Sequence, residues 1–289
     1  MNSDTYQYRD YVKSPDFVKS PFRYAGGKFY ALKHILPFID CVPHDEYREP
    51  FIGGGSVFFG KKKAPINIIN DLDKDIVTMY RAFADPEVAE KVSLLVQCEE
   101  ASKDRHSQMK AFSPSNFAEE AFKIYYLNRT SFCGIINNPA WGYKDGKSSP
   151  PQNWPAFIRS ASQKLQGVEI HNEDFTEIVR MPARGKKVLI YLDPPYFSAD
   201  QKRAYTKSFL YEDHLRVLEE LKKTDYLFCL SYDDVPEIRE MYSWAHIHEA
   251  KWLYNTANKR GESRELGNEL IITNYEVSIP QSFDLFSQE

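Results

Sequence analysis

The stretch VLIYLDPPYFSAD, residues 188–200, runs from apolar residues typical of a buried strand straight into Asp-Pro-Pro-Tyr. Val188 to Leu192 predict a buried β-strand, with Gly185, Lys186 and Lys187 as a polar lead-in. Proline cannot donate to a sheet and biases the preceding residue to extended geometry, so the strand ends with Asp193 at its carboxyl edge. Ligands bind at this edge in open α/β sheets. A lone Asp-Pro is more often an ordinary strand-ending turn, so the motif needs a second signal before it indicates a site.

The composition is that of a globular protein. The 289 residues, 42% of them hydrophobic and 15% aromatic, suffice for one large domain or a core domain with an insertion. No apolar stretch approaches the roughly 18 residues of a transmembrane helix, and the N-terminus lacks a signal-peptide pattern. We therefore expect a cytoplasmic protein with no membrane association.

Cysteine and histidine usage suggests neither disulfides nor metal ligands. Four scattered cysteines without a C-x-x-C pair predict reduced, mostly buried thiols. His246 and His248 alternate in an expected strand without a third ligand, so we expect no metal site.

The net charge of −4 conceals a basic segment between Phe122 and Gly167. The segment also contains tryptophan, tyrosine, glycine and proline, and it has one acid, Asp145. Its six basic residues are Lys123, Arg129, Lys144, Lys147, Arg159 and Lys164. A basic, aromatic and loop-rich segment suits a phosphate backbone and stacked bases. A solvated surface over core aromatics explains the same composition equally well.

The order of the expected elements predicts a parallel α/β sheet interrupted by an insertion. Strands at 46–52 and 66–71 alternate with helices at 29–39 and 72–84. After residue 167 the alternation resumes, with strands at 167–172, 188–192, 226–232, 245–254 and 268–275 and helices at 212–223 and 236–242. We therefore predict a discontinuous α/β domain, residues 1–85 and 168–289, and an insertion, residues 86–167.

The insertion is expected to contain two helices followed by an irregular basic stretch. The second helix carries a capping-box arrangement, with Asn116 at its start and Glu119 three residues later, before AFKIYYL.

A second signal stands in EPFIGGGS, residues 49–56. Glu49 is expected at a strand end, followed by Gly53, Gly54 and Gly55 in a loop before a helix. Glycines there allow close backbone approach to a ligand, and the helix start offers free N–H groups. Asp71, sixteen residues after Gly55 at the end of the next strand, can accept hydrogen bonds from ribose hydroxyls. This pairing indicates a nucleoside-bearing cofactor.

Two other nucleotide motifs fit poorly. The dinucleotide fingerprint requires a third glycine where Phe58 stands, which counts against NAD. The sequence YAGGKF is similar to a phosphate loop, but Phe29 stands where Ser or Thr follows the lysine.

Seven motifs in one order resemble the Dam-like, or alpha-group, adenine-specific DNA methyltransferases that use S-adenosylmethionine. They are RYAGGK at 23–28, EPFIGGGS at 49–56, NDLD at 70–73, LNRTSFCG at 127–134, EDF at 173–175, LDPPYF at 192–197 and RELGNELIITNY at 264–275. The resemblance covers nearly the whole chain. It implies a Rossmann-like methyltransferase sheet with helices on both faces and an inserted helical and looped target-recognition domain.

The resemblance also implies roles for particular residues. The catalytic pocket would be formed by Asp193, Pro194 and Tyr196. The cofactor would be bound by Tyr24, Lys28, Gly53, Gly55, Asp71, Phe175 and Asp193. Core packing is the alternative role for Tyr24 and Phe175.

For DNA binding, the resemblance implies five residues of the insertion. They are Arg129, Phe132, Asn137, Lys144 and Lys147. Phe132 stands where an aromatic side chain enters the duplex near the displaced adenine; a hydrophobic anchor for the preceding helix is the alternative. Asn137 stands where GATC-recognising relatives carry an arginine that contacts guanine, so the resemblance does not extend to GATC.

The function implied is methyl transfer to the 6-amino group of adenine in a specific double-stranded DNA sequence, with the base flipped out. Two alternatives stay open: a methyltransferase acting on an RNA or protein amine, and a catalytically silent DNA-binding module. We expect a monomer associated with the nucleoid. The sequence leaves open whether a cognate restriction endonuclease accompanies it.

Overall fold

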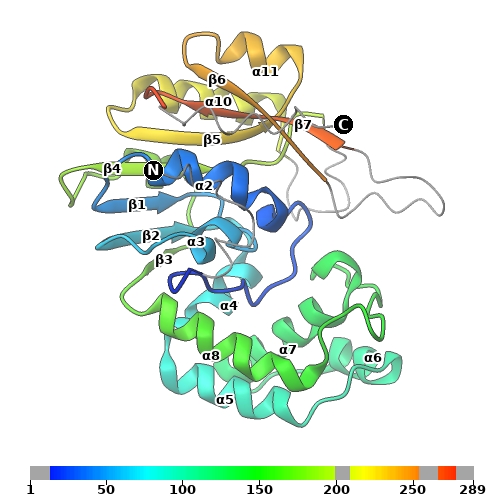
Figure 1. Ribbon diagram of the computed structural model, residues 1–289. Helices are drawn as coiled ribbons and strands as arrows, with labels where there is room; N and C mark the ends of the chain where they lie inside the picture. The colour runs from blue at the N-terminus through cyan, green and yellow to red at the C-terminus, as the bar shows by residue number, and fades with distance from the viewer. Residues whose placement is uncertain (1–13, 199–208, 254–265, 278–289) are drawn as a thin grey trace, which may run out of the picture.

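The computed structural model describes residues 14–198, 209–253 and 266–277, which form a seven-stranded sheet covered by helices (Figure 1). The strand order is β3-β2-β1-β4-β5-β7-β6, with β7 antiparallel to both its neighbours and the other pairs parallel. The strands are β1 (Glu46–Glu49), β2 (Ile66–Asn70), β3 (Glu169–His171), β4 (Val188–Leu192), β5 (Leu227–Asp233), β6 (His246–Leu253) and β7 (Leu266–Thr273). The predicted α/β fold is confirmed.

Strand β4 faces a hydrophobic core on each side. Its side chains alternate between the two faces, as in any strand. Leu189 and Tyr191 belong to one cluster of buried residues, whereas Val188, Ile190 and Leu192 belong to the other. All five residues are buried, which confirms the strand predicted from the sequence.

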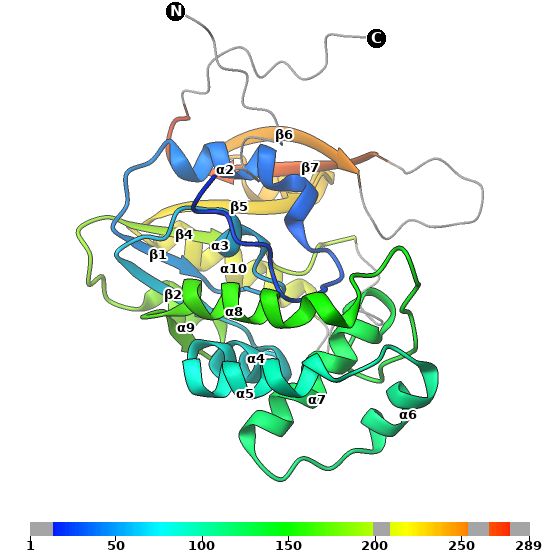
Figure 2. The ribbon, with the colours of Figure 1, turned by 60° about the horizontal axis from the view of Figure 1, so that its bottom comes forward.

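Helices cover both faces, as predicted. One face carries α2 (Leu32–Asp40), α3 (Ser56–Gly60), α4 (Lys74–Ala84), α5 (Pro86–Gln97), α7 (Phe117–Thr130) and α8 (Trp154–Leu165). The other carries α9 (Phe175–Arg180), α10 (Tyr211–Lys223) and α11 (Pro236–Met241). Short 3-10 helices span Lys28–Ala31, Phe132–Gly134 and Pro151–Asn153, and α6 (Lys103–Ala111) packs on α7. Figure 2 shows α8 beside α4 and α5.

The insertion has four helices, α5 to α8, where the sequence predicted two. The predicted cap is confirmed, because the Asn116 side chain accepts a hydrogen bond from the Glu119 N–H (3.0 Å). The Glu119 carboxylate accepts from Ser115 instead of closing a capping box. Helix α8 was missed because it starts at Trp154-Pro155 in a basic stretch. Proline is nonetheless favourable in a first helical turn, where its missing N–H has no partner to lose.

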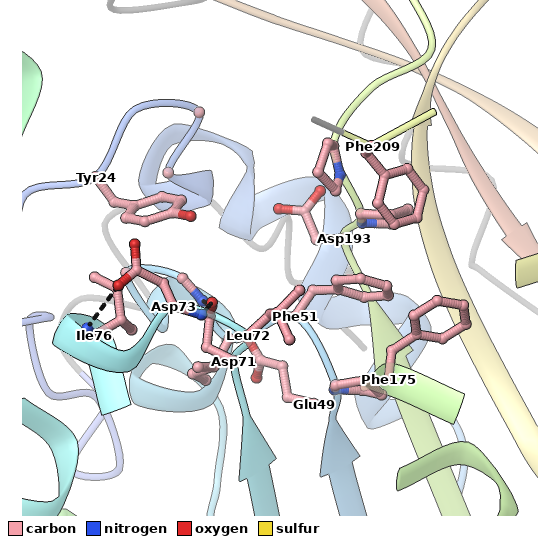
Figure 3. A pocket seen from close by; sticks show the side chains of 18 of the residues that line it. Tyr24, Glu49, Phe51, Asp71, Leu72, Asp73, Ile76, Phe175, Asp193 and Phe209 are labelled. Atoms are coloured by element: carbon pink, nitrogen blue, oxygen red, sulfur yellow. Dashed lines mark hydrogen bonds between the residues drawn. The ribbon is translucent and has the colours of Figure 1, made fainter. Parts of the chain in front are cut away.

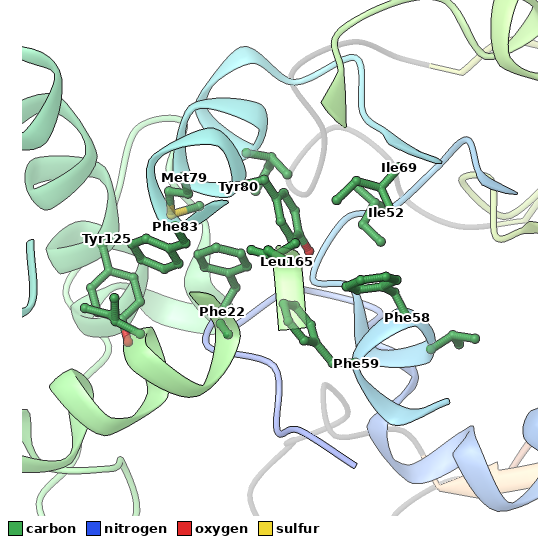
Figure 4. Packing of buried hydrophobic residues seen from close by; sticks show 14 of the residues in the cluster. Phe22, Ile52, Phe58, Phe59, Ile69, Met79, Tyr80, Phe83, Tyr125 and Leu165 are labelled. Carbon is green, nitrogen blue, oxygen red and sulfur yellow. The ribbon is translucent and has the colours of Figure 1, made fainter. Parts of the chain in front are cut away.

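The insertion shares its core with the sheet (Figure 4). Tyr125 of α7 packs edge-on against Phe83 of α4, with ring centroids 5.3 Å apart. Leu165 of α8 and Phe22 of the N-terminal segment belong to the same cluster. Because this cluster is continuous, the helices that precede and follow the basic loop are anchored against the sheet.

The structure tests three further expectations, which concern the cysteines, metal ligands and membrane-spanning helices. All four cysteines are free thiols, but only Cys229 is fully buried, so the expectation of mostly buried thiols is wrong. Within the described ranges no three or more His, Cys, Asp or Glu side chains are grouped to hold a metal ion. No helix in this part of the chain has the length and hydrophobicity to span a membrane.

Candidate active site

A cavity of about 680 Å³ lies at the carboxyl ends of β1, β2 and β4 (Figure 3). Strand β1 pairs with β2 on one side and with β4 on the other. The chain runs from β1 through β2 to β3 and then returns to β4 on the other side of β1, so the strand order reverses here. Ligands of open α/β sheets bind at such a switch point. Glu49, Asp71 and Asp193, which follow or end these three strands, all line the cavity. The structure therefore brings together the glycine motif and the Asp-Pro-Pro-Tyr motif.

The glycine loop has no room for side chains. Gly53 has φ +45°, and a Cβ atom built on it lies 2.7 Å from Cε1 of Tyr24. Gly55 has φ +67°, and a Cβ atom there lies 2.4 Å from the Tyr80 hydroxyl oxygen. That hydroxyl donates to the Gly53 carbonyl (3.0 Å). Both glycines are thus required by left-handed backbone and by close tyrosine packing, and the loop presents its bare backbone to the cavity.

Asp71 is held in place by two backbone donors. Its Oδ2 accepts from the Gly53 N–H (2.8 Å) and its Oδ1 from the Asp73 N–H (2.9 Å). Burial raises the pKa of this carboxyl to about 6. A carboxylate oxygen has more than one acceptor position, so both oxygens can still bind hydroxyl donors in the cavity.

Asn70 was not singled out in the sequence, yet it ties three strand ends together. Its buried amide donates to the carbonyls of Pro50 (2.9 Å) and Glu173 (3.0 Å). Its oxygen accepts from the Glu173 N–H (2.9 Å). A polar residue directly after the two isoleucines that end the strand sequence INII was the signal in the sequence.

Three phenylalanines form one wall of the cavity. Phe51 lies 5.2 Å from Phe175 and 5.9 Å from Phe209 between ring centroids. The Arg216 guanidinium lies 4.9 Å from the centroid of the Phe175 ring and donates to Asp174 (2.6 Å). Phe175 is only 4% exposed, so it belongs to the hydrophobic core and lines the cavity at once.

Asp193 follows β4 and is paired with Lys28. The Lys28 Nζ lies 2.8 Å from Asp193 Oδ1 and also donates to the Gly26 carbonyl (3.1 Å). It lies over the Tyr196 ring, 4.6 Å from the centroid. Burial raises the pKa of Asp193, and the Lys28 charge opposes that rise. Lys28, predicted as a cofactor contact, is thus bound to the turn predicted to be catalytic.

Glu49 is a second buried acid of the cavity. Its Oε2 accepts from the Tyr47 hydroxyl (2.7 Å). Burial raises its pKa to about 8, and the nearby negative charge of Asp193 adds to this rise. The sequence placed Glu49 at a strand end without giving it a role.

Four of the five predicted DNA-binding residues are exposed. Phe132 is 57% exposed, and Asn137, Lys144 and Lys147 also lie on the surface. The interpretation of Phe132 as a hydrophobic anchor is therefore wrong. Residues 134–137 line the cavity, so this loop borders the active site.

Arg129 contradicts its assignment as a surface residue. It is only 6% exposed, and its guanidinium donates to the Pro21 carbonyl (3.1 Å). The guanidinium carbon lies 5.8 Å from the Trp154 ring and 5.3 Å from the Phe157 ring. Sequence spacing could not show that this charge points into the shared core.

Asn128, also missed in the sequence, joins the basic loop to the N-terminal loop. It accepts from the Arg23 N–H (2.9 Å) and donates to the carbonyls of Arg23 (2.7 Å) and Gly134 (2.9 Å). Arg23 in turn donates to the carbonyls of Arg129 and Ser131. The residues around Tyr24 and those around Phe132 are therefore held as one unit.

The strand order of the sheet and the position of the cavity at its carboxyl edge are those of a Rossmann-like methyltransferase. Residues 24–256 match the D12 class of N6 adenine-specific DNA methyltransferases. The chain belongs to this family. It is an enzyme that methylates adenine in DNA, and dependence on S-adenosylmethionine follows from the family.

Curated relatives extend over most of the chain. A type II methyltransferase, M1.LlaDCHI of Lactococcus lactis, is 29% identical over 88% of this chain and 95% of its own length. M.CviBI, a type II methyltransferase of Paramecium bursaria Chlorella virus NC1A, is 24% identical over 89% of this chain and 100% of its own. The DNA N-6-adenine-methyltransferase of Escherichia phage P1 is 24% identical over 89% of this chain and 35% of its own.

Proposed function

We propose that this chain methylates the 6-amino group of adenine within a specific double-stranded DNA sequence, with S-adenosylmethionine in the cavity of about 680 Å³. One observation carries the proposal. Asp193 stands at the end of β4 in the same cavity as the glycine loop and Asp71. A nucleoside-bearing cofactor and a planar amine would therefore meet at one carboxylate.

The residues of the cavity fit such a cofactor. Asp71 offers a carboxylate oriented by two N–H groups, which suits the two hydroxyls of a ribose. The wall of Phe51, Phe175 and Phe209 suits the adenine ring of the cofactor, and Tyr24 covers the glycine loop where Gly53 and Gly55 would cradle it. Cavities of about 300–1,000 Å³ are typical of small-molecule sites.

Asp193 and Pro194 would act on the adenine amine. The lone pair of this amine is delocalised into the ring, which makes it a poor nucleophile. The Asp193 carboxylate and the Pro194 carbonyl can accept its two hydrogens and favour the pyramidal form, in which the lone pair is directed at the methyl donor. When bound, S-adenosylmethionine supplies the methyl group from its sulfonium. Tyr196 offers a stacking face for a base taken out of the duplex.

We propose residues 86–167 as the target-recognition part. Phe132 is exposed and stands two residues before the segment 134–137 that lines the cavity, and an aromatic side chain there could occupy the space of an extruded adenine. Lys144 and Lys147 are exposed and would contact phosphates, and Asn137, at the rim of the cavity, would face the bases. Arg129 is left out of this surface because it is buried.

One experiment tests the proposed reaction. The wild type and the Asp193→Ala variant are expressed in a host that lacks adenine methylation, and the host DNA is sequenced by a method that detects modified adenine. We expect methylated adenine at one short sequence with the wild type and none with the variant. Methylation of RNA or protein with unmodified DNA would support the amine alternative. Cofactor binding without methylation of any substrate would support the silent DNA-binding module.

The partners are also proposals. The Lactococcus relative is named as a type II methyltransferase, which supports a role beside a restriction endonuclease. A neighbouring gene product that cleaves the same sequence only when it is unmethylated would establish this. We further propose a nucleoid-associated monomer, which size-exclusion chromatography and localisation of a tagged protein would test.

A further inference from the structure

Two buried carboxylates lie side by side at the end of the sheet that borders the cavity. Asp233 ends β5 and Glu269 lies in β7, and their Cα atoms are partners in the antiparallel register. Asp233 is 7% exposed and Glu269 is fully buried. Burying an acid is costly unless it is hydrogen-bonded, so the donors to these two carboxylates decide what they do.

Glu269 is bonded to the catalytic turn. Its Oε2 accepts a hydrogen bond from the Tyr196 hydroxyl. Glu269 is the acid of the motif GNELIITNY, which the proposed reaction does not otherwise use. The bond joins a strand near the C-terminus to the tyrosine of Asp-Pro-Pro-Tyr, across 73 positions of the sequence.

Asp233 holds the two residues that follow Tyr196. It accepts from the N–H groups of Phe197 (2.9 Å) and Ser198 (2.8 Å). It also accepts from the Ser198 hydroxyl (2.5 Å). The backbone on the C-terminal side of the turn is thus fixed by a neighbouring strand.

The Tyr196 ring is held in two further ways. Lys28 lies over the ring, 4.6 Å from its centroid, and the same amine is paired with Asp193. The Tyr232 ring of β5 lies 6.2 Å away between centroids. A tyrosine has two side-chain torsions, so contacts on its face and at its hydroxyl together restrict the plane of the ring.

We infer that Glu269 is a positioning residue for the reaction. It fixes the plane of Tyr196, and Asp233 fixes the backbone of the two residues that follow it. The inference rests on the proposed role of Tyr196 as the stacking face for the target adenine. A base that stacks on a ring of fixed plane has its amine held near Asp193, and a loosely held ring would lose that alignment.

The test compares a variant at position 269 that loses the hydrogen-bond acceptor for the Tyr196 hydroxyl with a variant that keeps it. Glu269→Gln keeps an oxygen that can accept from the Tyr196 hydroxyl, whereas Glu269→Met has similar volume and no such oxygen. Tyr196→Phe removes the bond from the other side, and the double variant Tyr196→Phe/Glu269→Met completes a cycle. Tyr275→Phe is the matched control. Tyr275 lies beyond the last residue of β7, six positions after Glu269, and the substitution removes the hydrogen bond from its hydroxyl to the Phe38 carbonyl (2.7 Å).

Single-turnover methylation and cofactor affinity are measured for each variant on a duplex containing the target. We expect Glu269→Met and Tyr196→Phe to slow methylation about tenfold or more, with cofactor affinity within about threefold. Glu269→Gln should retain most of the rate. In the Tyr196→Phe background, adding Glu269→Met should lower the methylation rate by less than about threefold, because the hydrogen bond is already absent. Tyr275→Phe should leave the rate unchanged.

Three outcomes would overturn the inference. Equal losses from Glu269→Met in both tyrosine backgrounds would mean that Glu269 acts independently of Tyr196. A Glu269→Met variant with the wild-type rate would mean that the bond has no effect on the reaction. A Glu269→Met variant that fails to fold leaves Tyr196→Phe as the deciding variant, and a wild-type rate there overturns the inference.

A failure of the proposed function would look different. Tyr196→Ala removes the whole ring. Full activity in that variant would contradict the stacking role itself. Strong loss in Tyr196→Ala, with wild-type rates in Tyr196→Phe and Glu269→Met, would contradict only the role of Glu269.

Discussion

The turn at 193–198 and the loop at 132–147, through its residues 134–137, border the same cavity. The side chains of the turn are fixed by partners, whereas those of the loop that are predicted to bind DNA are exposed. In the turn, Asp193 is paired with Lys28, the Tyr196 hydroxyl with Glu269, and the following N–H groups with Asp233. In the loop, Phe132, Lys144 and Lys147 are exposed. The start of this loop is fixed through its backbone, since the Phe132 N–H donates to the Ala140 carbonyl (2.8 Å).

This difference fits two physical tasks. Transfer of a methyl group requires reacting atoms held at about 3–3.5 Å in line, so the groups that act on the amine have to be fixed before the substrate arrives. Binding to a phosphate backbone draws on long-range charge and tolerates adjustment of long side chains. Changes in the turn should therefore alter rate, and changes in the loop should alter affinity and base extrusion.

The largest effect is expected from Asp193→Ala. Removing the carboxylate that accepts from the amine should lower the methylation rate by about a thousandfold or more, the upper range for loss of one preorganised electrostatic group. Cofactor affinity should stay within about tenfold, because Asp71 and the aromatic wall are unchanged. Single-turnover methylation and calorimetry measure the two quantities. A variant retaining more than a few per cent of the wild-type rate would contradict the role of Asp193.

Phe132→Ala should distinguish paired from mismatched DNA. Unstacking a base step costs a few kcal/mol, so loss of an aromatic wedge should slow methylation of a paired target roughly 30- to 100-fold. The loss should be several-fold smaller when the target adenine is mismatched, because extrusion then costs less. The measurement is the ratio of the two rates, with a melting curve as the control for folding. Equal losses on both substrates would contradict the wedge.

Asp71→Ala should weaken the cofactor and leave the turn intact. We expect a loss of about 1–3 kcal/mol in binding, the scale of a charge-assisted hydrogen bond left unmade. Calorimetry at neutral pH measures it. Unchanged affinity would mean that the ribose is held elsewhere.

The pKa of Asp71 adds a pH dependence to the same site. Burial raises this pKa to about 6 in the free protein, and hydroxyl donors favour the charged form. Affinity for the cofactor should therefore be full at neutral and higher pH and fall as the pH drops through about 6. The Asp71→Asn variant should lack this fall between pH 7 and pH 5. A fall of the same size in that variant would assign the dependence to another group.

The sequence predicted the turn better than the loop for a physical reason. A strand end, a glycine loop and two prolines fix the backbone locally, so Asp71 and Asp193 could be brought to one sheet edge from sequence order alone. Glu269 is hydrogen-bonded to Tyr196, which lies 73 positions away, and Asn128 to Arg23, which lies 105 positions away. No local sequence pattern encodes such distant pairs.

Charge composition in the insertion was less informative. Arg129 and Lys144 contribute equally to the count of basic residues, yet one is buried between aromatic rings and the other is exposed. Helix α8 was hidden by the same composition, because its buried face includes Trp154, Ile158 and Leu165 among polar and basic residues.

The smallest effect is expected from the double variant Lys144→Ala/Lys147→Ala. It tests the difference between the exposed and the buried basic residues of the insertion. If both lysines bind phosphates, DNA affinity should fall alike on all sequences. The slope of log affinity against log salt should decrease by about 0.9 for each phosphate that is no longer neutralised, or about 1.8 for the pair. Fluorescence anisotropy over a range of salt concentrations measures the slope. The melting temperature should not change, because both side chains are exposed.

Arg129→Ala is the comparison variant, because it removes one positive charge from the same insertion, where the double lysine variant removes two. Its guanidinium packs against Trp154 and Phe157 and donates to the Pro21 carbonyl, so its loss should destabilise the fold. We expect about 1–3 kcal/mol, which lowers the melting temperature by about 2–4 °C per kcal/mol for a chain of this size. The salt slope of the folded variant should equal that of the wild type. A reduced salt slope at an unchanged melting temperature would mean that Arg129 contacts DNA. The distinction between buried structural and exposed DNA-binding charges would then be wrong.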